Sequence, residues 1–299
     1  MTDHSSHSHF TASPLFDVSH VTALVTGGGT GIGLMISQAL VANGAKVYIT
    51  GRRREVLEKT VRLYNTGPGS LHSIVGDVSS KEGAIKLARE IGEKEGGGIQ
   101  LLVNNAGIAR DDSTKFSNVG SPESTDPKAI SEHFLQSEEQ GWTSTFQTNV
   151  MGQYFTSMAL LPLLAKGNQR TPGYTSSVVN VSSISGAMKS SSMGQFAYAS
   201  SKAAFTHLSR MLGTTFKDVK VRVNVIAPAV FPSEMTTGSS GEDNKSQIDP
   251  SSQNPAGRKG TESDMAGTIL FLAGKGGVFY NEQIMYPDGG QTLAVPSVK

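Results

Sequence analysis

The sequence predicts an α/β fold in which helices cover both faces of a doubly wound parallel sheet. Three observations predict it: apolar strand-like runs alternate with helical stripes, a glycine-rich turn joins the first strand to the first helix, and polar motifs follow the ends of later strands. A chain of 299 residues with 37% hydrophobic content is accounted for by one large domain. We expect that domain to span residues 20–299.

The first predicted strand passes directly into a glycine turn and a helix over residues 21–34. Gly27, Gly31 and Gly33 fit the pattern G-x-x-x-G-x-G, whereas no start point fits G-x-G-x-x-G. A P-loop is excluded because Leu34 stands where its lysine is required. Such a turn presents backbone amides to a pyrophosphate, so we expect a dinucleotide to bind here in a Rossmann-type arrangement. A tight turn that binds nothing is the alternative.

The second predicted strand, residues 46–50, is followed by Arg52, Arg53 and Arg54. Folds that bind NAD usually place Asp or Glu at this point to accept from the ribose 2′-hydroxyl. A guanidinium group cannot accept that bond, but it pairs with a 2′-phosphate. The sequence therefore favours NADP(H) as cofactor, with Arg52 as the principal contact, while a solvated helix start also explains Arg53 and Arg54.

Further strands are predicted along the rest of the chain, and the ligand crevice of such a sheet lies at their carboxyl ends. Residues 109–141 and 231–260 are long polar stretches that look inserted or mobile, and we expect a mobile substrate lid at about 231–260. We expect residues 1–19, with their His/Ser tract, to form a disordered tail; metal binding by the tract is the alternative. The further strands are at 71–75, 99–103, 177–181, 221–226 and 283–286, with a helix at 81–94.

Composition excludes several classes of protein. The net charge is +1 without a long basic stripe, so we expect no nucleic-acid partner. The absence of cysteine excludes disulfides, thiolate catalysis and zinc–thiolate sites, and it favours a cytoplasmic location. No run approaches transmembrane length, so we expect no membrane partner. The expected partners are a small-molecule substrate and copies of this chain.

The candidate reacting groups lie on one helical run. Tyr198 and Lys202 share a helix face at i, i+4 spacing, and a neighbouring ammonium favours the phenolate form of tyrosine. Ser183 ends a strand fifteen residues earlier, where its hydroxyl can polarise a carbonyl oxygen. An ordinary amphipathic helix is the alternative for the pair. Neither G-x-S-x-G nor H-E-x-x-H occurs, and the isolated His207 is better explained by packing or solvation.

The ordered set of motifs resembles the short-chain dehydrogenase/reductase family, over about residues 21–293, and most closely its 3-oxoacyl reductase and rhamnolipid-type branch. The motifs are Thr26-Gly-x-x-x-Gly-Ile-Gly33, Asp77-Val78, Asn104-Asn-Ala-Gly107, Ser183 with Tyr198-x-x-x-Lys202, Asn224-Val-Ile-Ala-Pro228 and Pro287-Asp-Gly-Gly290.

The resemblance implies an oxidoreductase that acts on alcohol and ketone groups and uses no metal. It implies that Tyr198 is the general acid, that Ser183 orients the carbonyl oxygen, that Lys202 lowers the tyrosine pKa and holds the nicotinamide ribose, and that Asn149 anchors a water in the proton relay. The cofactor-binding residues that it implies, together with Arg52, are Gly27, Thr30, Gly31, Ile32, Gly33, Asp77, Val78, Asn104, Ala106, Gly107, Tyr198, Lys202, Pro228, Val230 and Ser233.

The resemblance leaves the substrate and assembly open. A 3-oxoacyl or related secondary-metabolite ketone leads, a gluconate or polyol dehydrogenase is the alternative, and a non-catalytic NADP(H)-binding scaffold or regulator is the alternative of another class. A homotetramer or a dimer is expected. One departure from the family is Ala229, where the family usually has Gly, because a methyl group there would crowd backbone near the nicotinamide if φ were positive.

Overall fold

The structure of the chain is a computed structural model, which describes residue 7 and residues 10–298. The described residues form a seven-stranded parallel sheet in the order β3-β2-β1-β4-β5-β6-β7. The chain order reverses between β1 and β4, which is where a doubly wound sheet opens a ligand crevice. The predicted fold class is confirmed. The strands are β1 (Thr22–Thr26), β2 (Lys46–Gly51), β3 (Ser70–Val75), β4 (Leu101–Asn104), β5 (Ser177–Val181), β6 (Arg222–Ile226) and β7 (Ile284–Met285).

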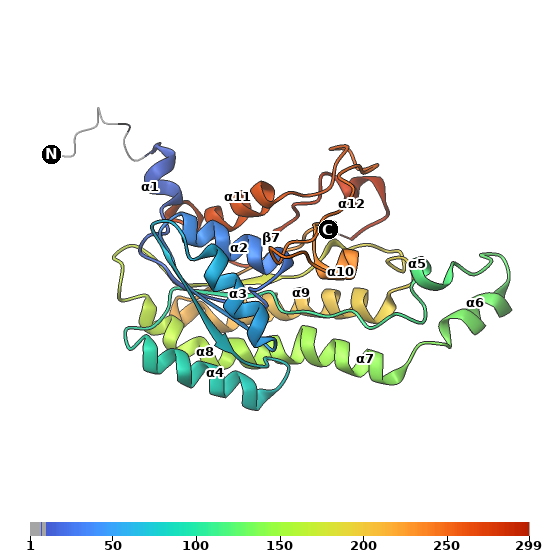
Figure 1. Cartoon of the computed structure of the whole chain (residues 1–299), viewed down its shortest axis with the longest axis horizontal. Helices are drawn as coiled ribbons and strands as arrows, with labels where there is room; N and C mark the ends of the chain where they lie inside the picture. The colour runs from blue at the N-terminus through green and yellow to red at the C-terminus, as the bar shows by residue number, and fades with distance from the viewer. Residues whose placement is uncertain (1–6, 8–9, 299) are drawn as a thin grey trace.

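The central strands are buried on both faces because helices cover the sheet from each side. One apolar core lies under α2 (Gly31–Ala42), α3 (Arg54–Tyr64) and α11 (Glu262–Ala273). The other lies under α4 (Lys81–Lys94), α8 (Gln153–Gly167) and α9 (Phe196–Phe216). Figure 1 shows α2 and α11 above the sheet and α4 and α8 below it. Two shorter elements continue into α8: helix α7 (Glu139–Phe146) and the π-helix η2 (Gln147–Gly152).

The prediction of a disordered tail over residues 1–19 is wrong at its carboxyl end, where the chain is folded. Helix α1 (Ala12–Phe16) forms there and lies beside α11 (Figure 1). Val18 is fully buried in the core under α11, and a Cβ on Gly274 would come 2.6 Å from the carbonyl oxygen of Leu15. Packing of these apolar groups orders the segment. Residues 1–6, 8 and 9 of the predicted tail, which include His4 and His9, lie outside the described residues.

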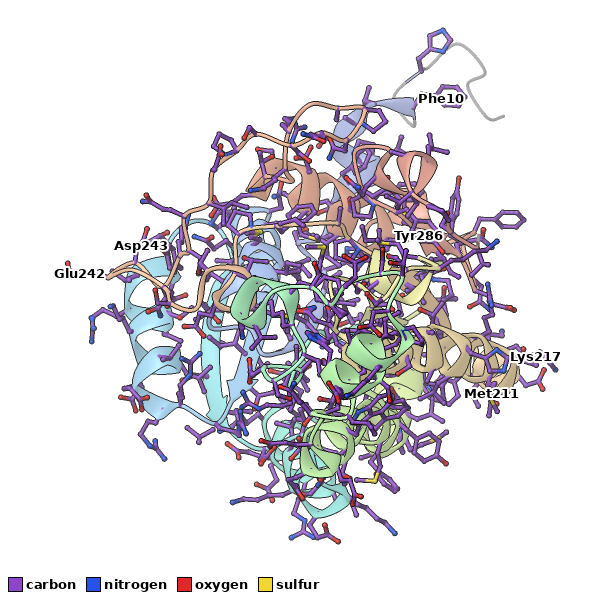
Figure 2. The ribbon with its side chains drawn as sticks, turned by 90° about the vertical axis from the view of Figure 1, so that its right-hand side faces the viewer. Phe10, Met211, Lys217, Glu242, Asp243 and Tyr286 are labelled. Carbon is purple, nitrogen blue, oxygen red and sulfur yellow. The ribbon has the colours of Figure 1, made fainter. Side chains whose placement is uncertain are left out.

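Residues 109–141 and 231–260 are both folded against the rest of the domain. The first contains α5 (Phe116–Val119) and α6 (Pro127–Phe134), which extend from one end of the molecule in Figure 1. The second contains α10 (Glu234–Thr237) and then reaches α3, because the Tyr64 hydroxyl donates to the carbonyl oxygen of Asp243 at 2.6 Å. Figure 2 shows Glu242 and Asp243 at the outer edge of the molecule beside α3. The remaining described elements are η3 (Ile184–Gly186), η4 (Lys217–Val219), η5 (Lys275–Gly277) and α12 (Gln291–Ala294).

Candidate active site

A cleft of about 500 Å³ lies at the carboxyl ends of the strands, where the chain order of the sheet reverses. Residues from the first glycine turn, from the end of β2, from the end of β4 and from α9 meet in it. Several of the predicted strand-end motifs therefore contribute to one hollow, although Gly33, Asn149 and Ser183 are not among the residues that line it. Its lining includes Gly27, Thr30, Gly31, Ile32, Arg52, Asp77, Val78, Ala106, Gly107, Tyr198, Lys202 and Ser233 among the predicted residues.

The glycine turn leaves the N-terminus of α2 open to the cleft. Gly27 and Gly31 have left-handed φ values of 63° and 53°, which favour glycine. A Cβ on Gly33 would lie 2.2 Å from the carbonyl oxygen of Gly27, so only glycine permits this approach. Thr30, the N-cap residue of α2, makes no side-chain cap bond, so the first amides of this helix remain available. An open helix N-terminus in a glycine cradle fits a pyrophosphate.

The side chain of Asn105 fixes the turn from the neighbouring strand end. Its Nδ2 donates to the carbonyl oxygens of Thr26 and Gly27, at 2.9 and 3.2 Å. The hydroxyl of Thr26 in turn accepts from the backbone amides of Asn105 and Ala106, both at 3.0 Å. These bonds couple the ends of β1 and β4, so the cleft floor is held in place from two strands.

The three arginines after β2 have different surroundings. Arg52 is exposed, lines the cleft, and has no hydrogen bond or ion pair among the described residues. Arg53 also borders the cleft, but both of its terminal nitrogens donate to the carboxylate of Glu234 in α10, at 3.2 and 2.7 Å. Arg54 lies within α3, 3.6 Å from Glu58. Arg52 is therefore the guanidinium with its charge unpaired at the mouth of the cleft.

Tyr198 and Lys202 lie in the first turns of α9 and are both buried. The ammonium of Lys202 donates to the carbonyl oxygen of Val181 at 2.9 Å and lies 5.7 Å from the centre of the Tyr198 ring. Burial lowers the pKa of Lys202 to about 8. Ser183 follows β5 and caps η3, accepting from the amide of Ser185 at 3.1 Å. The end of β5 and helix α9 thus bring the predicted reacting groups together.

The pKa of the Tyr198 phenol differs in direction from the sequence prediction. Burial raises it above its usual value, and hydrogen bonding with the Ser183 hydroxyl lowers it by less. The sequence predicted a lowered value from the neighbouring ammonium alone. Burial is the larger influence on the phenol in the folded chain, so its pKa is raised.

Asn149 lies in the π-helix η2, where the backbone departs from regular α-helix. Its side chain accepts from the amide of Ile108 at 2.9 Å and donates to the carbonyl oxygen of Ile108 at 2.8 Å. Its amide nitrogen also donates to the hydroxyl of Ser201 at 3.0 Å. A Cβ on Gly107 would come 3.2 Å from Oδ1 of Asn149 and 3.4 Å from Nζ of Lys202. Asn149 therefore lies beside the reacting cluster.

Asn104 is one of the predicted cofactor residues that do not line the cleft. Its side chain is 1% exposed and donates to the hydroxyl of Ser157 and to Oδ1 of Asn180, at 2.8 and 2.9 Å. Side chains alternate between the faces of a strand, so the side chain of Asn105 reaches the cleft instead. Pro228 and Val230 lie on the segment after β6 but do not line the cleft, whereas Ser233 does.

Ala229 does not crowd the backbone as its departure from the family suggested. Among the described residues other than glycine, positive φ occurs at Ser192, Met193, Lys220, Asn244 and Glu282, and Ala229 is not one of them. A residue with negative φ tolerates a Cβ, so alanine fits this position without backbone strain.

Sequence reasoning missed four residues that shape the site: Asn105, Asp111, Ser201 and Glu234. Asn105 is part of the motif Asn104-Asn-Ala-Gly107, so the sequence carried a signal for this residue. The other three form hydrogen bonds with partners distant in the sequence: Asp111 with the start of α9, Ser201 with Asn149, and Glu234 with Arg53. No local pattern signals such contacts.

Neither a metal site nor a membrane span is found in the part of the chain that the structure describes. No group of three or more His, Cys, Asp or Glu side chains there is arranged to hold a metal ion. No helix among the described residues combines the length and apolar character needed to cross a bilayer.

Comparison with known proteins gives consistent findings along the chain. Residues 21–244 match the family model described as short chain dehydrogenase. The chain is 39% identical over 288 residues to short-chain dehydrogenase/reductase PhomF' of Diaporthe leptostromiformis, with 96% of each chain covered. It is 35% identical to the rhamnolipids biosynthesis 3-oxoacyl-[acyl-carrier-protein] reductase of Pseudomonas aeruginosa, covering 93% of this chain and 98% of that one. The solved Pseudomonas aeruginosa RhlG/NADP active-site complex superimposes with a TM-score of 0.76 at 32% identity, covering 93% and 98%.

Proposed function

The chain belongs to the short-chain dehydrogenase family, and from that premise we propose that it is an NADPH-dependent reductase of a ketone carbonyl. Members of this family are oxidoreductases that bind a nicotinamide cofactor and act on alcohols and ketones. One observation carries the proposal: Tyr198 and Lys202 line the same cleft as the open glycine turn and Arg52. A reacting group and a dinucleotide cradle in one hollow are what carbonyl reduction requires.

The proposed roles follow from the positions of the side chains. Tyr198 donates its phenolic proton to the carbonyl oxygen as that oxygen gains negative charge. The raised pKa of Tyr198 suits this role, because an acid must still hold its proton when the substrate arrives. The Ser183 hydroxyl donates a hydrogen bond to the same oxygen and orients it.

Lys202 and Asn149 support the proton transfer. The ammonium of Lys202 lies near the Tyr198 ring and favours the phenolate that remains after donation. Lys202 also holds the nicotinamide ribose in this proposal. Asn149 lies beside Lys202, against Gly107, where it anchors a water that returns a proton to the tyrosine. The bound cofactor supplies the hydride.

Arg52 is the residue that favours NADPH over NADH in this proposal. Its unpaired guanidinium at the end of β2 fits a 2′-phosphate, and the sequence has arginine directly after β2 where folds that bind NAD usually have Asp or Glu. The similar RhlG structure is described as an NADP complex, which supports the same choice. Asp77 and Val78 line the cleft beyond the turn and would contact the adenine.

We propose a 3-oxoacyl or related secondary-metabolite ketone as the substrate class. The similar Pseudomonas aeruginosa enzyme is named a 3-oxoacyl-[acyl-carrier-protein] reductase. Apolar side chains are exposed on the segment before Tyr198, at Met193 and Phe196, and on the segment after β6, at Val230 and Met235, of which Met235 lines the cleft. The end of β5, next to Ser183, is joined to the segment after β6 where the amide of Ile184 donates to the carbonyl oxygen of Pro228 at 3.1 Å. We propose that residues 231–260 act as the lid over this apolar surface.

A polyol or sugar-acid dehydrogenase is the second candidate. Gluconate 5-dehydrogenase of Gluconobacter oxydans is 27% identical over 94% of this chain, and galactitol 2-dehydrogenase of Cereibacter sphaeroides is 28% identical over 93%. Substrates of that kind carry many hydroxyl groups, which the exposed apolar side chains on the segments before Tyr198 and after β6 do not match.

The test is NADPH oxidation, with an NADH control, over a panel that holds a 3-oxoacyl thioester, a keto-sugar acid, a diketone and a polycyclic ketone. Preference for the thioester supports the leading substrate class, and activity on the keto-sugar acid alone favours the second candidate. Tight NADPH binding without turnover on any ketone would instead indicate a non-catalytic scaffold.

The Tyr198→Phe variant tests the mechanism directly. It removes the transferable proton and keeps the ring, so we expect turnover to fall by at least about 100-fold while NADPH binding, followed by fluorescence, stays near that of the parent. Tyr280→Phe, at an exposed position between η5 and β7, is the matched control and should keep full activity. Undiminished turnover of the Tyr198 variant would contradict the assignment.

A homotetramer or dimer and a cytoplasmic location stay predictions.

A further inference from the structure

Asp111 is a buried carboxylate that bonds the start of the helix carrying Tyr198. The side chain is 3% exposed, and its two oxygens accept from the backbone amides of Ala197 at 2.9 Å and Tyr198 at 3.1 Å. These amides belong to the first turn of α9, whose N-cap residue, Gln195, makes no side-chain cap bond. Asp111 therefore acts as the cap of this helix from 86 positions away in the sequence.

A remote cap has a consequence that a local cap lacks. A local N-cap residue moves with its helix, whereas Asp111 lies on the segment that leaves β4 after Asn105, Ala106 and Gly107. Those three residues line the cleft. The two bonds thus fix the first turn of α9, including the backbone of the reacting tyrosine, relative to the cofactor side of the site.

Burial of a charged carboxylate needs compensation, and the helix N-terminus supplies it. Burial raises the pKa of Asp111, while the hydrogen bonds from Ala197 and Tyr198 lower it, with the net shift upward. A hydrophobic residue would avoid that cost, but it would leave the two amides without these acceptors. The carboxylate therefore does what an apolar side chain cannot do here.

Further bonds hold the loop before α9 to the same segment, residues 111–116, which we call the clamp segment. The hydroxyl of Thr114 donates to the carbonyl oxygen of Gly194 at 2.8 Å, and the amide of Phe116 donates to the carbonyl oxygen of Met193 at 2.9 Å. Ser192, Met193 and Gly194 have consecutive left-handed φ values of 52°, 60° and 85°. Such a conformation is unfavourable for the first two residues, so the clamp segment determines the shape of this loop.

We propose that Asp111 is a positioning residue for the reduction: through the amides of Ala197 and Tyr198 it holds the Tyr198 hydroxyl at the distance from which the proton is donated. This inference rests on the proposed function. Asp111 does not itself line the cleft, so it acts through the helix and not on substrate.

The experiment measures turnover of Asp111→Asn and Asp111→Ala per NADPH-binding site, counted by fluorescence titration. Asn keeps one acceptor oxygen and Ala keeps none, so we expect the loss of kcat to be graded, about 10-fold for Asn and about 100-fold for Ala, because small misplacements of reacting groups have effects of this size. The KM for NADPH should change little in both variants, since the glycine turn is untouched. Asp112→Asn, the exposed neighbour, is the matched control and should match the parent.

The outcomes separate a positioning role from a purely structural one. If the variants contain a smaller fraction of protein that binds NADPH but keep the parental turnover per binding site, Asp111 only stabilises the fold and the proposal is overturned. If Asp111→Ala does not fold, the result for Asp111→Asn decides. Normal turnover of both variants overturns the role of Asp111 and leaves the proposed function intact. No turnover by the parent on any ketone overturns both.

Discussion

Replacing Arg52 by alanine should lower the use of NADPH and leave the use of NADH unchanged. Arg52 borders the cleft without a partner among the described residues, so a 2′-phosphate would gain its full charge-assisted hydrogen bonds. Such bonds contribute about 1.5–3 kcal/mol, which corresponds to a loss of about 10- to 150-fold in kcat/KM for NADPH. NADH lacks the phosphate, so its kcat/KM should stay constant.

The two neighbouring arginines provide graded controls for this effect. Arg53 is already bonded through two nitrogens to Glu234, so a phosphate must compete for it and Arg53→Ala should have a smaller effect, on the order of a few-fold. Arg54 lies within α3 beside Glu58, and Arg54→Ala should change kcat/KM by less than about twofold.

The assay is initial-rate kinetics with both cofactors at one fixed salt concentration, because salt screens exposed charges. Arg52→Asp extends the series: its carboxylate can accept from a ribose 2′-hydroxyl, so preference should move toward NADH. An equal fall with both cofactors in Arg52→Ala, or an equal effect of Arg54→Ala, would refute the reasoning and place the phosphate elsewhere.

Two further predictions concern the cofactor cradle and the stability of the sheet. In Gly33→Ala the new Cβ would lie 2.2 Å from the carbonyl oxygen of Gly27, so the turn must shift and NADPH binding, measured by fluorescence, should weaken strongly; unchanged affinity would contradict the cradle. Burial raises the pKa of Glu95, but hydrogen bonds from Lys46 and Tyr48 lower it by more, so the net pKa lies below its usual 4.5. The charged Glu95 therefore stabilises the fold fully above a pH of about 4.5, and this contribution is lost as the pH falls through the lower pKa of the folded state. In urea titrations, the difference in unfolding free energy between the parent and Glu95→Gln should shrink below that pH. A difference that stays constant with pH would exclude this linkage.

The sequence by itself determined the order of the strands along the chain and which polar motifs follow their ends. Alternating apolar periodicities predicted each of the strands β1 to β7, with shifts of one or two residues at some ends, because burial on both faces requires a continuous apolar run. The glycine turn was equally readable, since Gly27 and Gly31 adopt φ values that other residues rarely tolerate. The spacing of Tyr198 and Lys202 on one helix face is also a local property.

Only the tertiary structure decided which side chains face the cleft and what holds them there. Asn104 and Asn105 are adjacent, and the register of β4 against β5 turns the first toward Asn180 inside the protein and the second toward the glycine turn. The pairing of Arg53 with Glu234 and the cap that Asp111 places on α9 each join segments far apart in the chain. Contacts of this kind leave no periodic trace in a sequence, because they depend on how whole elements pack and not on the spacing of neighbouring residues.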